Sequence, residues 1–153
     1  MERGAEKGYT GWWTCQIDIF WGNKMGVIKS HRDLIVYKKS FAAASEVFQI
    51  SKRFPREEMY SLTDQVRRAS RSVAANLAEA WRKRRYEKHF LSTLNIAEAE
   101  AAETQAWIEF SVAHEYISDE VGAELNEKYE EILRMLVAMT NHPEKWVLNI
   151  SED

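Results

Sequence analysis

Apolar side chains recur every three or four residues along most of the chain after about residue 33. This spacing places them on one face of an α-helix, whereas a half-buried strand would show strict alternation. The pattern is interrupted three times, so it predicts four helices. They cover approximately residues 33–53, 57–85, 86–117 and 119–141.

Each predicted helix has an inner face made of residues three and four positions apart. The first face is Leu34, Tyr37, Phe41, Ala44 and Phe48, and the second is Leu62, Val66, Ala69, Val73, Asn76 and Ala80. The third is Phe90, Leu94, Ala97, Ala101, Thr104 and Ile108, and the fourth is Val121, Leu125, Tyr129, Ile132, Leu136 and Met139. Together the four faces can enclose one core.

The ends of the first two helices are marked by residues that cap or break helices. Asp33 is a plausible N-cap of the first helix, and Pro55 disfavours helix at the residue before it, so this helix should stop near Arg53. The negative charges of Glu57 and Glu58 suit a helix N-terminus, and we expect the second helix to begin there.

The connections between the predicted helices are short. Ser118 or Asp119 is the expected N-cap of the fourth helix, and Asn141 with Pro143 ends it. Short connections make neighbouring helices antiparallel, and no segment is typical of a strand. The sequence therefore predicts an all-α protein, an antiparallel up-down-up-down four-helix bundle.

Composition agrees with one domain. A chain of 153 residues that is 45% hydrophobic and 29% charged can bury one proper core. Residues 1–30 have no sustained periodicity but carry three of the six tryptophans, so they form an irregular N-terminal extension or an aromatic docking arm. Met25, just before the patterned part, is a candidate start. Residues 31–142 form the bundle and residues 143–153 a C-terminal tail.

The single cysteine, Cys15, excludes an intrachain disulfide and a zinc site built on paired thiolates. A reducing, cytoplasmic setting is the expectation that follows. No run approaches the roughly 18 apolar residues that would span a membrane, and Gln16 and Asp18 make the segment around them unsuitable as the core of a signal peptide. No membrane partner is expected.

The second predicted helix resembles the signature of a known family. The stretches Leu62–Ala69 (LTDQVRRA) and Ser72–Glu79 (SVAANLAE), preceded by Phe54 and Pro55, are similar to those of the 23S rRNA-intervening-sequence proteins. The resemblance covers about residues 33–139. Two positions differ: Ala80 follows the Asn-x-Ala-Glu element in place of glycine, and Ala99-Glu100 replaces Gly-Ser in the third helix.

The resemblance implies a bacterial four-helix bundle without established enzymatic activity. It also implies a homo-oligomer, because some relatives form ring-shaped pentamers. A related accessory protein of diversity-generating retroelements, the accessory variability determinant, works by binding nucleic acid and a reverse transcriptase. RNA or DNA, and a protein partner, are therefore expected partners. A charge at Glu100 puts the relatives' oligomeric interface in question for this chain.

Charge is unevenly distributed along the chain. Residues 51–90 contain eleven Lys or Arg against five acids, whereas residues 91–153 contain three against fourteen. The candidate nucleic-acid-binding residues in the basic part are Arg67, Arg71, Arg82, Lys83, Arg84, Arg85 and Lys88. Trp81, Tyr86 and His89 could stack on bases beside them. Alternatively, these cations cap a helix C-terminus, pair with the acidic fourth helix or remain solvated at the end of the bundle. A further alternative is that the basic and acidic faces mediate self-association or docking to another protein.

A row of polar residues, the polar seam, is predicted beside the apolar face of the second helix. Its members are Gln65, Arg68, Ser72, Asn76 and Glu79, spaced by three or four. One interpretation is hydrogen bonding that fixes the register of the helices, because an amide near the core needs partners. The other is that Arg68 and Glu79 contact a ligand or a neighbouring subunit.

Catalytic and metal-binding patterns are missing from the sequence. No His is preceded by Glu at three positions, the pair that carboxylate-rich bundles use to hold metals. No Gly-rich phosphate loop, nucleophile elbow or His-Glu-x-x-His element occurs. We therefore expect no cofactor, no metal and no catalytic residue.

The sequence thus favours a non-enzymatic binding module that assembles as a homo-oligomer and engages RNA through the basic helix junction. The alternative is a structural or protein-adaptor bundle without nucleic-acid binding. The third helix has more apolar and small side chains than one core needs, including Trp107 and Phe110. Some of these residues are expected between subunits.

Overall fold

The computed structural model describes residues 27–148, which form four α-helices and three short 3-10 helices without any strand. In chain order the elements are η1 (His31–Asp33), α2 (Ile35–Ser51), η2 (Arg56–Glu58), α3 (Leu62–Lys83), α4 (Glu87–Ala113), α5 (Asp119–Asn141) and η3 (Pro143–Lys145). The predicted all-α class is confirmed. Residues 1–26 of the predicted N-terminal extension lie outside the described residues.

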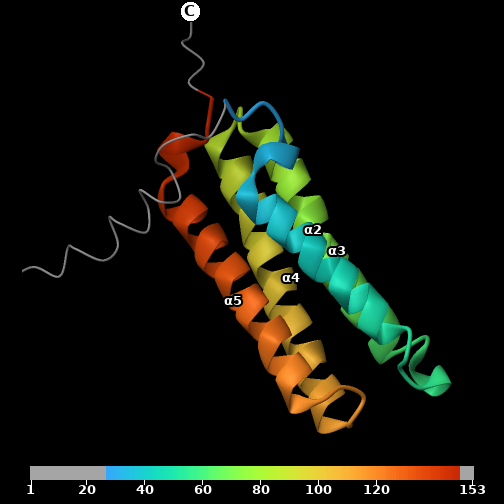
Figure 1. Cartoon of the computed structure of the whole chain (residues 1–153). Helices are drawn as coiled ribbons and strands as arrows, with labels where there is room; N and C mark the ends of the chain where they lie inside the picture. Colours follow the sequence, from blue (N-terminus) through green and yellow to red (C-terminus); the bar gives the residue numbers. More distant parts are fainter. Residues whose placement is uncertain (1–26, 149–153) are drawn as a thin grey trace, which may run out of the picture.

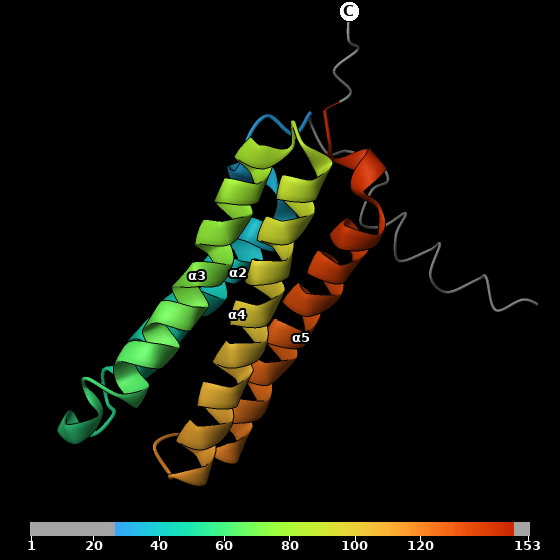
Figure 2. The same cartoon turned by 180° about the vertical axis from the view of Figure 1, so that it is seen from behind.

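The four helices run antiparallel in the predicted up-down-up-down order (Figures 1 and 2). α3 packs most extensively against α4, and α2 completes the ring by contacting both α3 and α5. The junction of α3 and α4 therefore lies at the same end of the bundle as the start of α2 and the end of α5. No helix among the described residues is long and apolar enough to span a membrane.

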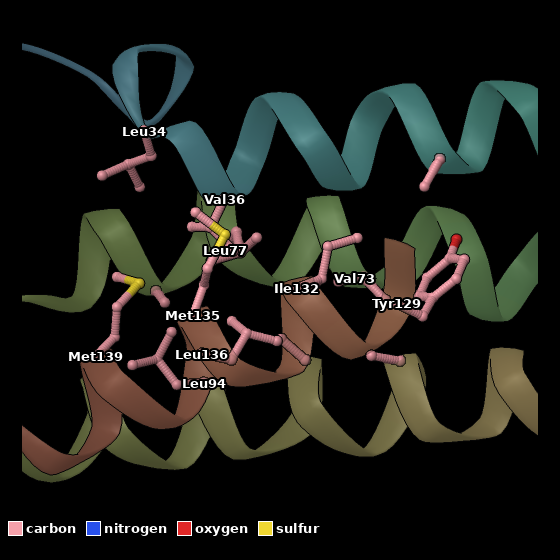
Figure 3. Close-up of a cluster of buried hydrophobic side chains, with 14 of the residues drawn as sticks. Leu34, Val36, Val73, Leu77, Leu94, Tyr129, Ile132, Met135, Leu136 and Met139 are labelled. Atoms are coloured by element: carbon pink, nitrogen blue, oxygen red, sulfur yellow. The ribbon is translucent and has the colours of Figure 1, made fainter. Parts of the chain in front are cut away.

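The core is a single cluster running along the axis of the bundle (Figure 3). All six inner residues predicted for α4 are buried, and α5 differs from its prediction only at the half-buried Val121. In α3 only Asn76 is half-buried instead of buried. The sequence pattern therefore identified the inward faces of three of the four helices.

The predicted inner face of α2 is wrong in part. Leu34 and Ala44 are buried, but Phe41 is 60% exposed and Tyr37 and Phe48 are only half-buried. The positions that α2 buries are small or β-branched: Val36, Ser40, Ala43, Ala44, Val47 and Ser51. Because α2 carries apolar residues on two adjoining faces, periodicity could not determine which one faces the core.

Both predicted N-termini in the first half of the bundle need correction. Asp33 is the third residue of η1, whose N-cap is Ser30, and α2 itself begins after Leu34, which makes no side-chain capping bond. The Asp33 carboxylate accepts from the backbone N–H groups of Lys29 and Ser30, each at 2.9 Å, and these two hydrogen bonds lower the pKa of Asp33. α3 begins at Leu62 instead of Glu57, because residues 56–58 form η2 and the chain turns once more before the helix starts.

The Glu58 carboxylate ties the two helical hairpins together at the end opposite the α3–α4 junction. It accepts hydrogen bonds from the Ser61 hydroxyl and from the backbone N–H of Leu62 at 3.2 Å, which caps α3. Its other oxygen accepts from the Tyr116 hydroxyl at 2.9 Å, in the loop between α4 and α5. The Tyr116 ring also packs against Phe54, with centroids 5.6 Å apart.

Helix α4 ends at Ala113, four residues before the predicted end, in a Schellman motif. The N–H of Glu115 donates to the Val112 carbonyl at 2.9 Å and that of Tyr116 to the Ser111 carbonyl at 2.8 Å. This closure puts Glu115 at φ 61°, a left-handed conformation that favours glycine. The Ser118 hydroxyl then accepts from Val121 N–H, which confirms Ser118 as the N-cap of α5.

Glu58→Gln is expected to destabilise the protein at neutral pH, with the loss fading in acid. Hydrogen bonds from Ser61, Leu62 and Tyr116 lower the pKa of Glu58 below its ordinary value of 4.5. A carboxylate with a lowered folded-state pKa stabilises the fold above its unfolded pKa, and the stabilisation disappears as the pH falls through the folded value. Urea denaturation of both proteins between about pH 7 and about pH 3 measures this convergence. Glu57→Gln, an exposed neighbour, is the control, and a pH-independent difference for Glu58→Gln would contradict the argument.

Glu115→Gly is expected to stabilise the protein by about 1 kcal/mol, because glycine adopts the left-handed conformation without the penalty that a Cβ atom imposes. The matched control is Ala113→Gly, at the last helical residue two positions earlier, where introducing glycine should lower the free energy of unfolding by up to about 1 kcal/mol. Urea midpoints at constant m-value give both changes. A loss of stability in Glu115→Gly would show that the Glu115 side chain contributes more than its backbone conformation costs.

Candidate nucleic-acid interface

The junction between α3 and α4 is a tight basic turn. α3 ends at Lys83, Arg84 is its C-cap, and α4 begins at Glu87 after the N-cap Tyr86. The C-terminus of a helix carries partial negative charge from its free carbonyl groups, so cationic side chains are favourable there. In Figures 1 and 2 this turn lies at one end of the bundle, beside η1.

Three of the candidate cations at this junction are accessible to a phosphate group from solvent. Arg82, Arg85 and Lys88 are exposed, and none of them forms an ion pair with any described residue. Two exposed rings lie close to them in sequence: Tyr86 is 62% exposed, and its ring centroid is 5.8 Å from that of His89, which is also exposed. Cations and stackable rings therefore share one solvent-facing surface.

The other two candidate cations at the junction are engaged within the protein. Lys83 forms an ion pair with Glu79, one turn earlier in α3, at 2.5 Å. The Arg84 guanidinium lies over the Trp81 ring, 3.4 Å from its centroid, and burial followed by repulsion from Arg82 lowers the pKa of Arg84. The Arg84 carbonyl also accepts from Leu148 N–H at 3.0 Å. Arg84 thus connects the junction to the C-terminal segment.

Trp81 cannot stack on a base, contrary to the prediction, because it is only 6% exposed and belongs to the core. Its spacing of four residues from Leu77 and seven from Ala74, both buried, could have indicated this position. Because Trp81 is buried, the candidate stacking rings at the junction are those of Tyr86 and His89.

Lys29 and Arg32 extend the basic surface in a way that the sequence analysis missed. Both are exposed, and η1, which contains Arg32, contacts α3. The nearby acid, Asp33, already accepts hydrogen bonds from two backbone N–H groups. Charge counted along continuous segments could not reveal a surface assembled from residues about fifty positions apart.

Arg67 and Arg71 do not belong to this surface. Their guanidinium carbons lie 4.9 and 5.3 Å from the centroid of the Phe48 ring on α2, and Arg67 Nε donates to the Ser51 hydroxyl at 2.7 Å. Arg82 lies eleven positions after Arg71, which at a rise of 1.5 Å per residue corresponds to roughly 16 Å of helix. The structure thus divides the predicted basic residues between two places.

The polar seam forms mainly pairs within α3. Arg68 Nε bonds the Asp64 carboxylate at 3.1 Å, and Asn76 Nδ2 donates to the Ser72 carbonyl at 2.8 Å and hydroxyl at 3.0 Å. Gln65 and Glu79 are exposed, and Glu79 holds the lysine already described.

Ser72 is the seam residue that faces a neighbouring helix. Burial, followed by the charge of Glu103, raises the pKa of Glu100 in α4, and the nearby Ser72 hydroxyl opposes this rise. The seam therefore meets α4 at the very position where this chain has glutamate in place of the family's serine. Arg68 and Glu79 remain on the outer surface of α3.

Within residues 27–148, no group of three or more His, Cys, Asp or Glu side chains is arranged to hold a metal ion. The arrangement at the junction supports attraction of anions and stacking.

The comparisons with known proteins agree with the signature in α3. The family model of the 23S rRNA-intervening sequence proteins matches residues 32–138. A solved structure, a protein of unknown function from the S23 ribosomal protein family of Bacteroides thetaiotaomicron, is similar with a TM-score of 0.63 and 30% identity. The similarity covers 69% of this chain and 98% of the other. Among curated proteins, none matches the chain significantly in sequence. The chain belongs to the family of 23S rRNA-intervening sequence proteins.

Proposed function

We propose that the protein is a non-enzymatic, self-assembling module of the bacterial cytoplasm that binds RNA through the end of the bundle where α3 meets α4. The observation that carries the proposal is a set of three exposed cations without an ion-pair partner in residues 27–148, namely Arg82, Arg85 and Lys88, near the exposed rings of Tyr86 and His89. Cations attract phosphates, and aromatic faces stack on unpaired bases without regard to sequence.

RNA is the first nucleic acid to test, because the family description refers to 23S rRNA. An α-helix end with flexible cations presents no rigid set of donors to base edges, so recognition would depend on charge and shape. Loops and bulges offer unstacked bases to Tyr86 and His89, and double-stranded DNA does not. A structured RNA should therefore bind more tightly than duplex DNA of equal length.

Self-assembly, the second part of the proposal, is supported by α4. Its exposed side carries Phe110, which is 49% exposed, and the half-buried Trp107, whose ring centroids are 5.8 Å apart. Large apolar side chains in contact with each other at a surface favour burial against a partner. A ring of five is the stoichiometry that the family resemblance implies. The alternative, an adaptor for another protein, would use the same apolar surface but not the cations.

The triple variant Arg82→Ala, Arg85→Ala, Lys88→Ala is expected to weaken binding of an RNA hairpin and to flatten its salt dependence. Each lost phosphate contact should reduce the slope of log K against log salt by about 0.7 to 0.9, because fewer counterions are released. Fluorescence anisotropy over a series of salt concentrations measures both quantities. If the wild type shows no salt-sensitive binding, RNA binding is not the function.

A control variant with the same change in charge separates local contacts from a general loss of positive charge. Arg53→Ala, Arg56→Ala, Arg134→Ala removes three exposed arginines that form no ion pair among the described residues and lie away from the junction. It should retain most of the affinity and of the salt slope. Equal losses in the two triple variants would assign the binding to overall charge instead of to the junction.

Arg84→Ala is expected to act on stability, unlike its neighbours. It removes the guanidinium that covers Trp81, which should cost about 1 kcal/mol in the free energy of unfolding. Arg82→Ala and Arg85→Ala, which change exposed side chains, should stay within about 0.5 kcal/mol of the wild type. Urea denaturation distinguishes them, and an Arg84→Ala protein of unchanged stability would show that this stacking is inconsequential.

A further inference from the structure

The side chains that α2 excludes from the core line a groove on the surface between α2 and α3, which lie side by side in both views (Figures 1 and 2). The groove measures about 470 Å³, and its walls are the rings of Tyr37, Phe41 and Phe48 from α2 opposite Arg71 and Ala75 from α3. Its remaining lining is small or uncharged, and no acid contributes to it.

The charge at the groove is positive. The Phe48 ring lies under three cations, with Lys52 Nζ at 4.8 Å from its centroid in addition to the guanidinium groups of Arg67 and Arg71. Arg71 and Lys52 are exposed and form no ion pair with a described residue. A complementary partner would therefore be apolar and acidic.

Helix α4 presents a surface of that kind, here named the α4 stripe: Ile96, Ala99, Glu103, Ala106 and Phe110. Spacings of three and four place these residues on one helical face, and all five are exposed. Ile96 and Phe110 are large anchors at its two ends, while Ala99 and Ala106 allow a close approach. Glu103 lies in the middle and is the acid that would meet Arg71.

We infer that the α2–α3 groove of one molecule receives the α4 stripe of a second copy of this chain. The groove lacks acids and is bordered by cations, and the stripe lacks cations and contains an acid, so each surface repels itself and attracts the other. This inference rests on the self-assembly in the proposed function and specifies its surfaces.

The geometry of the contact follows from the position of the two surfaces. The groove lies on the α2 side of α3, whereas the stripe belongs to α4 on the other side of α3, where Ser72 meets Glu100. One surface of each copy binds a different surface of the next, so the contact is heterologous. Such a contact leaves a free groove and a free stripe on any dimer and continues until a ring closes.

Two variants test the surfaces separately. Phe41→Glu places a carboxylate in the groove, where it would face Glu103, and Phe110→Glu removes an anchor of the stripe. Both positions are exposed, so the variants should fold, as circular dichroism can verify. Should Phe110→Glu disturb α4, Ala106→Lys tests the same stripe with Phe110 in place. Val137→Glu, on an exposed position of α5 outside both surfaces, is the control.

Light scattering at micromolar concentration should give an oligomer for the wild type and for Val137→Glu, and the 17.9 kDa monomer for each interface variant. An equimolar mixture of Phe41→Glu and Phe110→Glu should produce a heterodimer of twice that mass, because one intact stripe and one intact groove remain. Monomers in the mixture would overturn the heterologous pairing. A monomeric wild type would overturn self-assembly itself, and an oligomer unaffected by Phe41→Glu would overturn only these surfaces.

Discussion

The packing of the bundle has to accommodate the Tyr129 ring, the largest fully buried side chain among the described residues. The ring extends from α5 into the core, where no described residue hydrogen-bonds its phenolic oxygen, and burial raises the Tyr129 pKa above its ordinary value. Protein interiors are packed at crystal density, so a side chain of this size requires small ones around it. The side chains that α2 buries include the small ones of Ser40 and Ala43. The larger aromatic residues of α2, Tyr37, Phe41 and Phe48, lie outside the core and line the groove between α2 and α3.

This constraint also explains which part of the fold could be predicted. α3, α4 and α5 each have one continuous apolar face, so a spacing of three and four was sufficient to identify it. α2 has two, one with Val36 and Val47 and one with Phe41 and Phe48, and hydrophobicity alone favoured the aromatic one. The correct choice depends on the volume that the other three helices leave in the core. Periodicity contains no information on that volume.

The candidate RNA surface was predictable to a similar extent. The excess of Lys and Arg around the start of α4 pointed to Arg82, Arg85 and Lys88, which are exposed and form no ion pair with any described residue. Local charge could not show that Arg84 would cover Trp81, because this contact depends on which face of α3 packs into the core and buries the indole. Nor could it add Arg32, which reaches the junction only through the packing of η1 against α3. In both cases the missing information was tertiary contact.

The two proposed surfaces reinforce each other physically. The groove and the stripe run along the length of the bundle, whereas the basic junction lies at one end. In a ring with cyclic symmetry every copy is related to the next by the same rotation, so bundles that pack lengthwise point in one direction. Their basic ends then gather on one rim. An RNA that contacts one end meets the others at a high effective concentration, so weak contacts by three cations per copy can sum to tight binding. If several ends act together, a single copy would need neither a deep pocket nor a rigid set of base-reading side chains: the selectivity would lie in RNA shapes that reach several ends at once. A copy with an intact basic junction but a blocked groove would retain its own contacts with RNA and would lose the gain in affinity that comes from binding by several copies.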